Sequence, residues 1–286
     1  MKGFDNMYIL SFYLFWVLIS YLFSMLFGLD FNSFNELSFY LLSIASLLIG
    51  VILSFIFQLI ILTLMGDIRK GSSFDNNFNH KFVNSFFYLI LHILRVKVIT
   101  TGKENIPEDK FVLIGNHQEN YDIIVLKPIF KDNNIDFIAK ESLMNVPIIG
   151  KWILLLGNIP ISRYADRSAA ESIVKGIRQV RDGMTMGIFP EGRRSFGNKL
   201  IDFKPGAFKL AIKPKADILV VTIYNCSNIL KSYPFKKQKV YVHIHKLLKY
   251  EDYKELNSHE LAIKVKNDIQ LQLNIFEKKY GKNNNQ

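Results

Sequence analysis

Two long apolar stretches open the chain. Met7–Leu29 is 23 residues long and Leu37–Gly66 is 30 residues long, and neither contains a charged residue. A helix needs about 20 apolar residues to cross the hydrocarbon core of a bilayer, so each stretch is long enough. The short link at 30–36 would close a helical hairpin. We therefore expect a membrane-anchoring hairpin over residues 1–70, with one helix in each stretch.

Two alternatives to a membrane hairpin are disfavoured. A cleaved secretory signal fits poorly because the start is poor in charge and a second apolar stretch follows. Buried helices of a soluble protein fit poorly because both stretches are too long. A hairpin that dips into one leaflet without crossing remains open. Whether it crosses or dips, the hairpin leaves the body of the chain on the same side as the N-terminus.

Beyond the hairpin, the apolar positions become shorter and more regularly spaced. Residues 71–94 are expected to form a polar linker (71–79) and an interfacial or core helix (82–94). Strands are predicted at 95–100, 111–114, 135–139, 185–189, 218–223 and 239–245. Helices are predicted at 123–130, 148–156, 166–181, 207–212 and about 253–280. This alternation predicts an α/β domain over 95–280, with a mixed or parallel sheet flanked by helices, before a disordered tail at 281–286.

Charge is divided unevenly between the two parts. Residues 1–66 carry a net charge of −2 and the remainder carries +13, within a chain total of +11. Arg69, Lys70 and Lys81 follow the second apolar stretch, whereas the link between the stretches has no Lys or Arg. The positive-inside rule therefore places the body in the cytoplasm, at the cell membrane. A basic body is also attracted to anionic lipid headgroups.

Charge and cysteine content disfavour a nucleic-acid partner, an internal disulfide and a cysteine nucleophile. A nucleic-acid partner could also account for a pI near 9.5, but the anchor already supplies a negatively charged surface, so no nucleic-acid partner is expected. The single Cys226 excludes an internal disulfide and fits a reducing compartment. Its apolar surroundings indicate a buried small side chain rather than a nucleophile.

Polar clusters follow two of the predicted strands. One is "GNHQENYD" (115–122) and the other is "PEGRRS" (190–195). Sites in α/β sheets collect at the carboxyl ends of strands, so these clusters are the candidate site.

The first cluster contains a possible catalytic pair. A spacing of five on a regular helix separates side chains by about 140°, so His117 and Asp122 can meet only if the chain turns between them. Asp122 would then fix the His117 tautomer and leave the other ring nitrogen as a general base. The alternative makes Asp122 a helix cap and His117 a turn residue. Spacing alone does not decide between the two.

The second cluster is suited to a phosphate. Adjacent guanidinium groups at Arg193 and Arg194 offer bidentate donors beside Gly192, and the alternative is a solvated basic turn paired with Glu191. Arg163 and Lys140 are further cations at strand ends. No G-x-S-x-G elbow, Walker A motif or dinucleotide-binding glycine pattern is present. No metal site is expected, because His243 and His245 lack a third ligand nearby in the sequence.

The two clusters together resemble the glycerolipid acyltransferase superfamily. "NHQENYD" and "FPEGRRS" match its H-x4-D and F-P-E-G-x-R-S blocks, and most closely those of the bacterial 1-acylglycerol-3-phosphate acyltransferases. Segments 102–107, 139–163 and 203–211 also look like family segments in the family order. The similarity runs from about Val96 to Thr222. Glu119 stands where serine is common, Arg193 where threonine is common, and Val220 where proline is usual.

The resemblance implies a fold like that of glycerol-3-phosphate acyltransferase and an acyl transfer. The acyl donor would be acyl-CoA or acyl-carrier protein, the acceptor the sn-2 hydroxyl of lysophosphatidate, and the product phosphatidate for phospholipid synthesis. His117 matches the base and Asp122 its partner. The residues that match acceptor-binding positions are Glu191, Gly192, Arg194 and Arg163, with Lys140 and Arg193 as possible additions. No tightly bound cofactor is implied. The alternatives are another acceptor, glycerol-3-phosphate or a different lysophospholipid, and a non-catalytic protein that binds anionic lipid.

Overall fold

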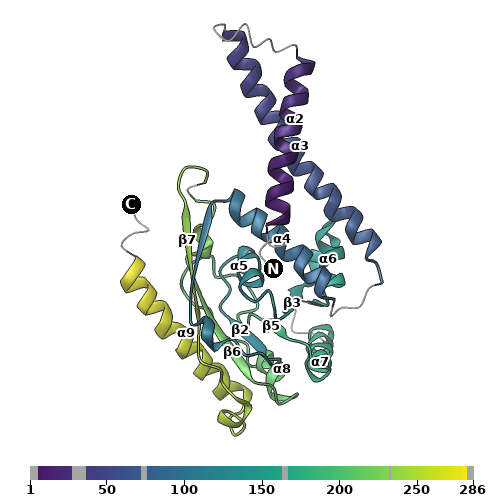
Figure 1. The fold of residues 1–286 in the computed structure, drawn as a ribbon. Helices are drawn as coiled ribbons and strands as arrows, with labels where there is room; N and C mark the ends of the chain where they lie inside the picture. Colours follow the sequence, from purple (N-terminus) through teal and green to yellow (C-terminus); the bar gives the residue numbers. More distant parts are fainter. Residues whose placement is uncertain (1–5, 28–36, 72–75, 163–166, 232, 282–286) are drawn as a thin grey trace.

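A seven-stranded mixed sheet forms the centre of the protein (Figure 1). The computed structural model describes residues 6–27, 37–71, 76–162, 167–231 and 233–281. The strand order is β1-β7-β6-β2-β5-β3-β4. The strands are β1 (Val96–Thr101), β2 (Val112–Gly115), β3 (Asp136–Lys140), β4 (Ile159–Ile161), β5 (Met186–Ile188), β6 (Ile218–Tyr224) and β7 (Gln238–Ile244).

Five neighbouring strands run in the same direction. β6, β2, β5, β3 and β4 are parallel, whereas β7 is antiparallel to β6 and β1 is parallel to β7. β2 and β6 are buried along their whole length, which explains why their sequences are continuous apolar runs rather than alternating ones. The carboxyl ends of the five parallel strands therefore lie along one edge of the sheet.

Helices cover both faces of the sheet. One core holds side chains of α7 (Arg167–Arg181), α8 (Lys209–Ile212) and α9 (Ser258–Tyr280) against the sheet. The other core lies under α5 (Tyr121–Ile129) and includes Leu91 at the end of α4 (Asn77–Ile93). The predicted fold class, a mixed α/β sheet flanked by helices and preceded by a two-helix hairpin, is confirmed.

The hairpin helices are α2 (Met7–Leu26) and α3 (Leu37–Ile68). Both are long and apolar enough to cross a membrane, and only 11% and 22% of their most apolar 18-residue windows is buried. This exposure distinguishes them from core helices of a soluble protein. The two helices project together from one side of the domain (Figure 1).

The base of the hairpin is fixed to the α/β domain. Tyr8 of α2 packs edge-on against Phe82 of α4, with 5.2 Å between ring centroids. Trp152, on α6 (Ile149–Leu155), donates a hydrogen bond of 2.9 Å from Nε1 to the carbonyl of Leu62 on α3. A shared apolar cluster surrounds these contacts. Of the two alternatives for the helix after the linker, α4 is a core helix, since it lies between the hairpin and α5.

Several boundaries differ from the predictions for local reasons. α4 begins at Asn77 rather than residue 82, because the Asn76 side chain accepts hydrogen bonds from the first free backbone N–H groups. α9 begins at Ser258 rather than near 253, because Asn257 and Glu260 form a capping box there. The helix predicted at 207–212 is a 3₁₀ turn, Pro205–Phe208, followed by the single turn of α8.

One strand was missing from the predicted strand ranges, although Arg163 was expected at a strand end. β4 is only three residues long and has Pro160 at its centre. Proline cannot donate to a ladder, and it is tolerated here because β4 is the edge strand beside β3. The hairpin link at 30–36 and the tail at 282–286 lie outside the described residues, so their predicted structures stay predictions.

Candidate active site

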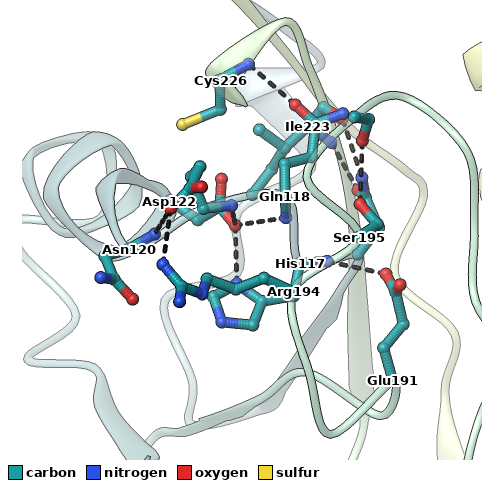
Figure 2. Close-up of polar contacts among 12 residues, drawn as sticks. His117, Gln118, Asn120, Asp122, Glu191, Arg194, Ser195, Ile223 and Cys226 are labelled. Atoms are coloured by element: carbon teal, nitrogen blue, oxygen red, sulfur yellow. Dashed lines mark hydrogen bonds and ion pairs between the residues drawn. The ribbon is translucent and has the colours of Figure 1, made fainter. Parts of the chain in front are cut away.

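The first polar cluster follows β2 at the carboxyl edge of the sheet, and the side-chain amides of Asn116 and Gln118 hold it in place. The Asn116 side chain accepts from the backbone N–H of Ile223 at 2.7 Å and donates to the Ile223 carbonyl at 2.9 Å, which extends the β2–β6 pairing by one residue. Gln118 is buried, donates to Asn198 and accepts from the backbone N–H of Cys226. These bonds fix the backbone on both sides of His117 (Figure 2).

His117 and Asp122 are hydrogen-bonded to each other. The distance from Nδ1 of His117 to Oδ2 of Asp122 is 2.7 Å. The same oxygen accepts the backbone N–H groups of Gln118 and Glu119, at 2.6 and 2.9 Å. Because an ionised carboxylate oxygen can only accept, Nδ1 carries the hydrogen of this bond and Nε2 is the basic nitrogen. Asp122 therefore orients the imidazole and also stabilises the turn before α5. It is not the helix cap of the alternative interpretation, because the N-cap of α5 is Asn120.

Phe189 holds the imidazole from one side. The two rings are stacked, with centroids 4.5 Å apart and planes 8° apart. Asp122 is fully buried, whereas the His117 side chain keeps 18% of its surface exposed. The Asp122 carboxylate is thus shielded from solvent, whereas the His117 imidazole is accessible to it.

Glu191 points inward from the second cluster and lies under the first. Its Oε1 accepts the backbone N–H of His117 at 2.8 Å, and its Oε2 accepts that of Ile201 at 3.1 Å. Burial raises the pKa of the Glu191 carboxyl to about 7, against the lowering effect of these two bonds. Since both oxygens are used by the backbone, this geometry gives Glu191 a positioning role beneath His117.

Arg194 returns to the first cluster. Backbone bonds from Ser195 to His117 and from Phe196 to Gln118 join the two clusters, at 2.8 and 3.2 Å. Arg194 then forms an ion pair with Glu119, 2.9 Å from Nη1 to Oε2 (Figure 2). Its guanidinium also lies 4.6 Å from the centre of the Phe196 ring. The structure thus places a partly exposed guanidinium on the turn that carries the imidazole.

Gly192 is required by the backbone of the second cluster. Its φ of +67° lies in the left-handed region, and an added Cβ would lie 3.0 Å from Nζ of Lys204. Lys204 is held there by a backbone hydrogen bond of 2.8 Å to the Pro190 carbonyl. Lys204 was not among the predicted site residues. Its presence in the family-like segment "FKPGAFKLA" was the available signal.

The other predicted cations are less closely placed. Arg193 is exposed beside Arg194. Lys140 is exposed at the carboxyl end of β3, on the same sheet edge but beyond β5. Arg163 lies outside the described residues, two positions after the end of β4. Its predicted role therefore stays a prediction.

Cys226 lies close behind the pair without the properties of a nucleophile. The thiol is fully buried and free. Burial raises its pKa well above the usual value, and the charge of Asp122 adds to the effect. Among the described residues, no group of three or more acidic, histidine or cysteine side chains is arranged to hold a metal ion.

Comparisons with known proteins identify the family of the chain. Residues 97–225 match the family model described as Acyltransferase. The chain is 38% identical over 173 residues to the 1-acyl-sn-glycerol-3-phosphate acyltransferase of Borreliella burgdorferi, covering 58% of this chain and 69% of that protein. The chain belongs to the glycerolipid acyltransferase family. Its members are O-acyltransferases. The resemblance to this family that the two polar clusters indicated is therefore confirmed.

Two further relatives extend the comparison. The Haemophilus influenzae 1-acyl-sn-glycerol-3-phosphate acyltransferase is 27% identical over 209 residues, which cover 71% of this chain and 85% of that protein. The crystal structure of the 1-acyl-sn-glycerophosphate acyltransferase PlsC from Thermotoga maritima superposes with a TM-score of 0.59. It is 22% identical and covers 78% of this chain and 92% of that one. At this identity the likeness shows a shared acyltransferase fold.

Proposed function

We propose that this acyltransferase transfers a fatty acyl group to the sn-2 hydroxyl of lysophosphatidate and so produces phosphatidate for phospholipid synthesis. The observation that carries the proposal is the His117–Asp122 hydrogen bond, which leaves Nε2 of His117 as a base beside the Arg194 guanidinium. The names of the relatives from Borreliella burgdorferi and Haemophilus influenzae support the choice of acceptor.

In the proposed reaction, His117 is the only group that exchanges a proton with substrate. Nε2 removes the proton from the acceptor hydroxyl, and the resulting alkoxide attacks the thioester carbonyl of acyl-CoA or acyl-carrier protein. The tetrahedral intermediate collapses, the C–S bond breaks, and the thiolate takes the proton back from the imidazolium. Asp122 stabilises the imidazolium throughout. No acyl-enzyme, metal or tightly bound cofactor takes part.

The acceptor phosphate would be held by cations of the second cluster. Arg194 is the main candidate because its ion pair with Glu119 holds its guanidinium on the turn that carries His117. Arg163, Lys140, Arg193, Gly192 and Lys204 complete the proposed acceptor site. Holding the hydroxyl against the base contributes several of the roughly 7–11 kcal/mol available from positioning.

The proposed location is the cell membrane, with the α/β domain facing the cytoplasm. The uncovered apolar surfaces of α2 and α3 support an anchor that is either integral or monotopic. The basic residues after the hairpin support the cytoplasmic side. A membrane location suits a substrate and product that both reside in the bilayer.

The experiment is an assay of the purified chain with a panel of acceptors and labelled acyl donors. We expect lysophosphatidate to be the preferred acceptor and His117→Ala to reduce turnover by about 10³-fold. Preference for glycerol-3-phosphate or another lysophospholipid would replace the proposed acceptor. Full activity in His117→Ala would overturn the mechanism. Absence of transfer to every acceptor by the unaltered chain would favour a non-catalytic, lipid-binding role.

A further inference from the structure

The loop between β6 and β7 carries an exposed surface that the proposed reaction does not use. Phe235 is 86% exposed, and Leu230 and Tyr233 are also exposed apolar side chains. Residues 230–239 contain four lysines and no acidic residue. We name the exposed side chains Leu230, Lys231, Tyr233, Phe235, Lys236 and Lys237 the β6–β7 tip.

The tip is held in place by contacts at its base. Ile229 is buried in the core, and Cys226 at the start of the loop is also buried. Arg95 donates a hydrogen bond of 2.7 Å from Nη1 to the carbonyl of Pro234. The apolar side chains of the tip are thus exposed on a loop that is fixed at both its start and its middle.

The same contacts connect the tip to the hairpin. Arg95 follows directly after α4, whose last turn contains His92. The Tyr13 hydroxyl of α2 lies 2.7 Å from Nε2 of His92. Figure 1 shows the β6–β7 loop rising on the side of the domain from which α2 and α3 project. These contacts place the tip on the hairpin side of the domain, towards the end of α4 that contacts Tyr13.

The side chains near the base of α2 and on the tip are of the types found at a bilayer surface. Tyr13 and Trp16 lie where α2 passes from its contact with α4 to its exposed half, and Tyr and Trp are enriched at membrane interfaces. Lysines flanking exposed aromatic side chains suit anionic headgroups above the acyl boundary. The loop also follows β6, so it lies along the sheet edge that carries His117.

We propose that the β6–β7 tip is a second membrane contact, in which Phe235 enters the headgroup region of an anionic bilayer and Lys231, Lys236 and Lys237 bind lipid phosphates. With the hairpin it would fix two points of the domain on one plane. This orientation turns the His117 edge of the sheet towards the lipid, where a lysolipid acceptor resides.

A fluorescent probe on the full chain tests the contact directly. Phe235→Cys is labelled with an environment-sensitive dye, since the native Cys226 is buried. The protein is then compared in detergent and in nanodiscs of zwitterionic or mixed anionic lipid. We expect a blue-shifted emission in nanodiscs, larger with anionic lipid, and quenching by lipids spin-labelled near the headgroup.

A matched control uses an exposed apolar residue far from the hairpin. Ile263 is 48% exposed and lies near the start of α9. The start of α9 is at the end of the domain away from α2 and α3 (Figure 1). Dye on Ile263→Cys should stay unquenched with a water-like emission. Equal behaviour of the two probes would overturn the proposal. So would a shift at Phe235 that requires an added acidic protein rather than lipid.

A charge-reversal variant gives a functional readout that rests on the proposed reaction. Lys231→Glu/Lys236→Glu/Lys237→Glu should raise the apparent KM for acceptor presented in anionic bilayers about tenfold. Turnover of a short-chain, water-soluble acceptor should be unchanged. A loss on both acceptors would overturn the contact as the cause. Inactivity of the unaltered enzyme on lysophosphatidate would contradict the proposed function, while the dye result would stand independently.

Discussion

Glu119 and Arg194 lie 75 positions apart in the chain and form an ion pair, with 2.9 Å between Oε2 and Nη1. The Glu119 carboxylate therefore binds the Arg194 guanidinium, which is proposed to hold the acceptor phosphate. Both side chains are only partly exposed, at 20% and 28%. An incoming phosphate has to displace Glu119 or share Arg194 with it.

Glu119→Gln should consequently tighten acceptor binding. A partly exposed ion pair contributes up to about 1 kcal/mol, so we expect the apparent KM for the acceptor to fall about two- to fivefold, with kcat little changed. Steady-state kinetics on lysophosphatidate measure both. Glu171→Gln, which removes the exposed pair with Arg167 on α7, is the control and should change neither. A higher KM in Glu119→Gln would show instead that Glu119 holds Arg194 in its binding position.

Asp122→Asn tests the orienting carboxylate separately from the base. The amide oxygen can still accept the three N–H groups, but it lacks the charge that stabilises the imidazolium. We expect kcat to fall about 100-fold, with an unchanged apparent KM, because Asp122 contacts His117 and is fully buried. Asp109→Asn, at an exposed position, is the control. Unchanged kcat with a lowered melting temperature would reduce Asp122 to a turn-stabilising residue.

Glu191→Gln should destabilise the fold despite its small change in size. Both carboxylate oxygens accept backbone N–H groups, and an amide would place its own N–H against one of them. We expect a loss of about 1–3 kcal/mol in the free energy of unfolding, together with lower activity as the His117 backbone shifts. Thermal melting and turnover measure these effects. Glu108→Gln, an exposed glutamate, serves as the control.

The pH dependence of stability gives an independent check on Glu191. Its pKa is raised from 4.5 to about 7 in the folded protein, so between these values the unfolded chain releases a proton that the folded chain retains. The free energy of unfolding of the wild type, relative to Glu191→Gln, should therefore fall as the pH rises from 4.5 to 7 and level off above. A difference that is constant across this range would contradict the raised pKa.

The sequence predicted the sheet, its flanking helices and the pairing of the two polar clusters because each depends on the pattern of apolar and polar residues within a short segment. β2 and β6 are uninterrupted apolar runs, and His117 and Arg194 follow strand ends. β4 escaped prediction because a three-residue strand with a central proline has no period to detect. Helix starts were displaced where a single Asn side chain supplied the cap.

The orientation of individual site residues could not be read from the sequence in the same way. Glu191 and Arg194 occur three positions apart in one motif, yet Glu191 points into the protein beneath His117 and Arg194 points to Glu119. The stacking of Phe189 on His117 depends on β2 and β5 being neighbours, which is a long-range property. Motif spacing identifies the participants, and tertiary contacts assign their directions.

A buried lysine links α4, which packs against the hairpin, to α5, which follows the turn that carries His117. Lys127 of α5 donates a hydrogen bond of 2.6 Å from Nζ to the Ile135 carbonyl and lies 3.4 Å from Nδ1 of His80 on α4. Nε2 of His80 lies 3.7 Å from Oδ1 of Asp136, which is also buried. Burial lowers the Lys127 pKa to about 8, against the raising effect of Asp136.

Lys127→Met should therefore be far more destabilising than its good steric match suggests. It leaves Asp136 as a buried carboxylate without its lysine and the Ile135 carbonyl without its donor, so we expect a loss of about 3–5 kcal/mol. Lys254→Met is the matched control, since Lys254 pairs with Glu251 at the solvent-screened surface and its loss should change the melting temperature little. Melting temperatures of the full chain in detergent compare the two. Equal melting temperatures would show that the buried Lys127 contacts do not stabilise the junction between α4 and α5.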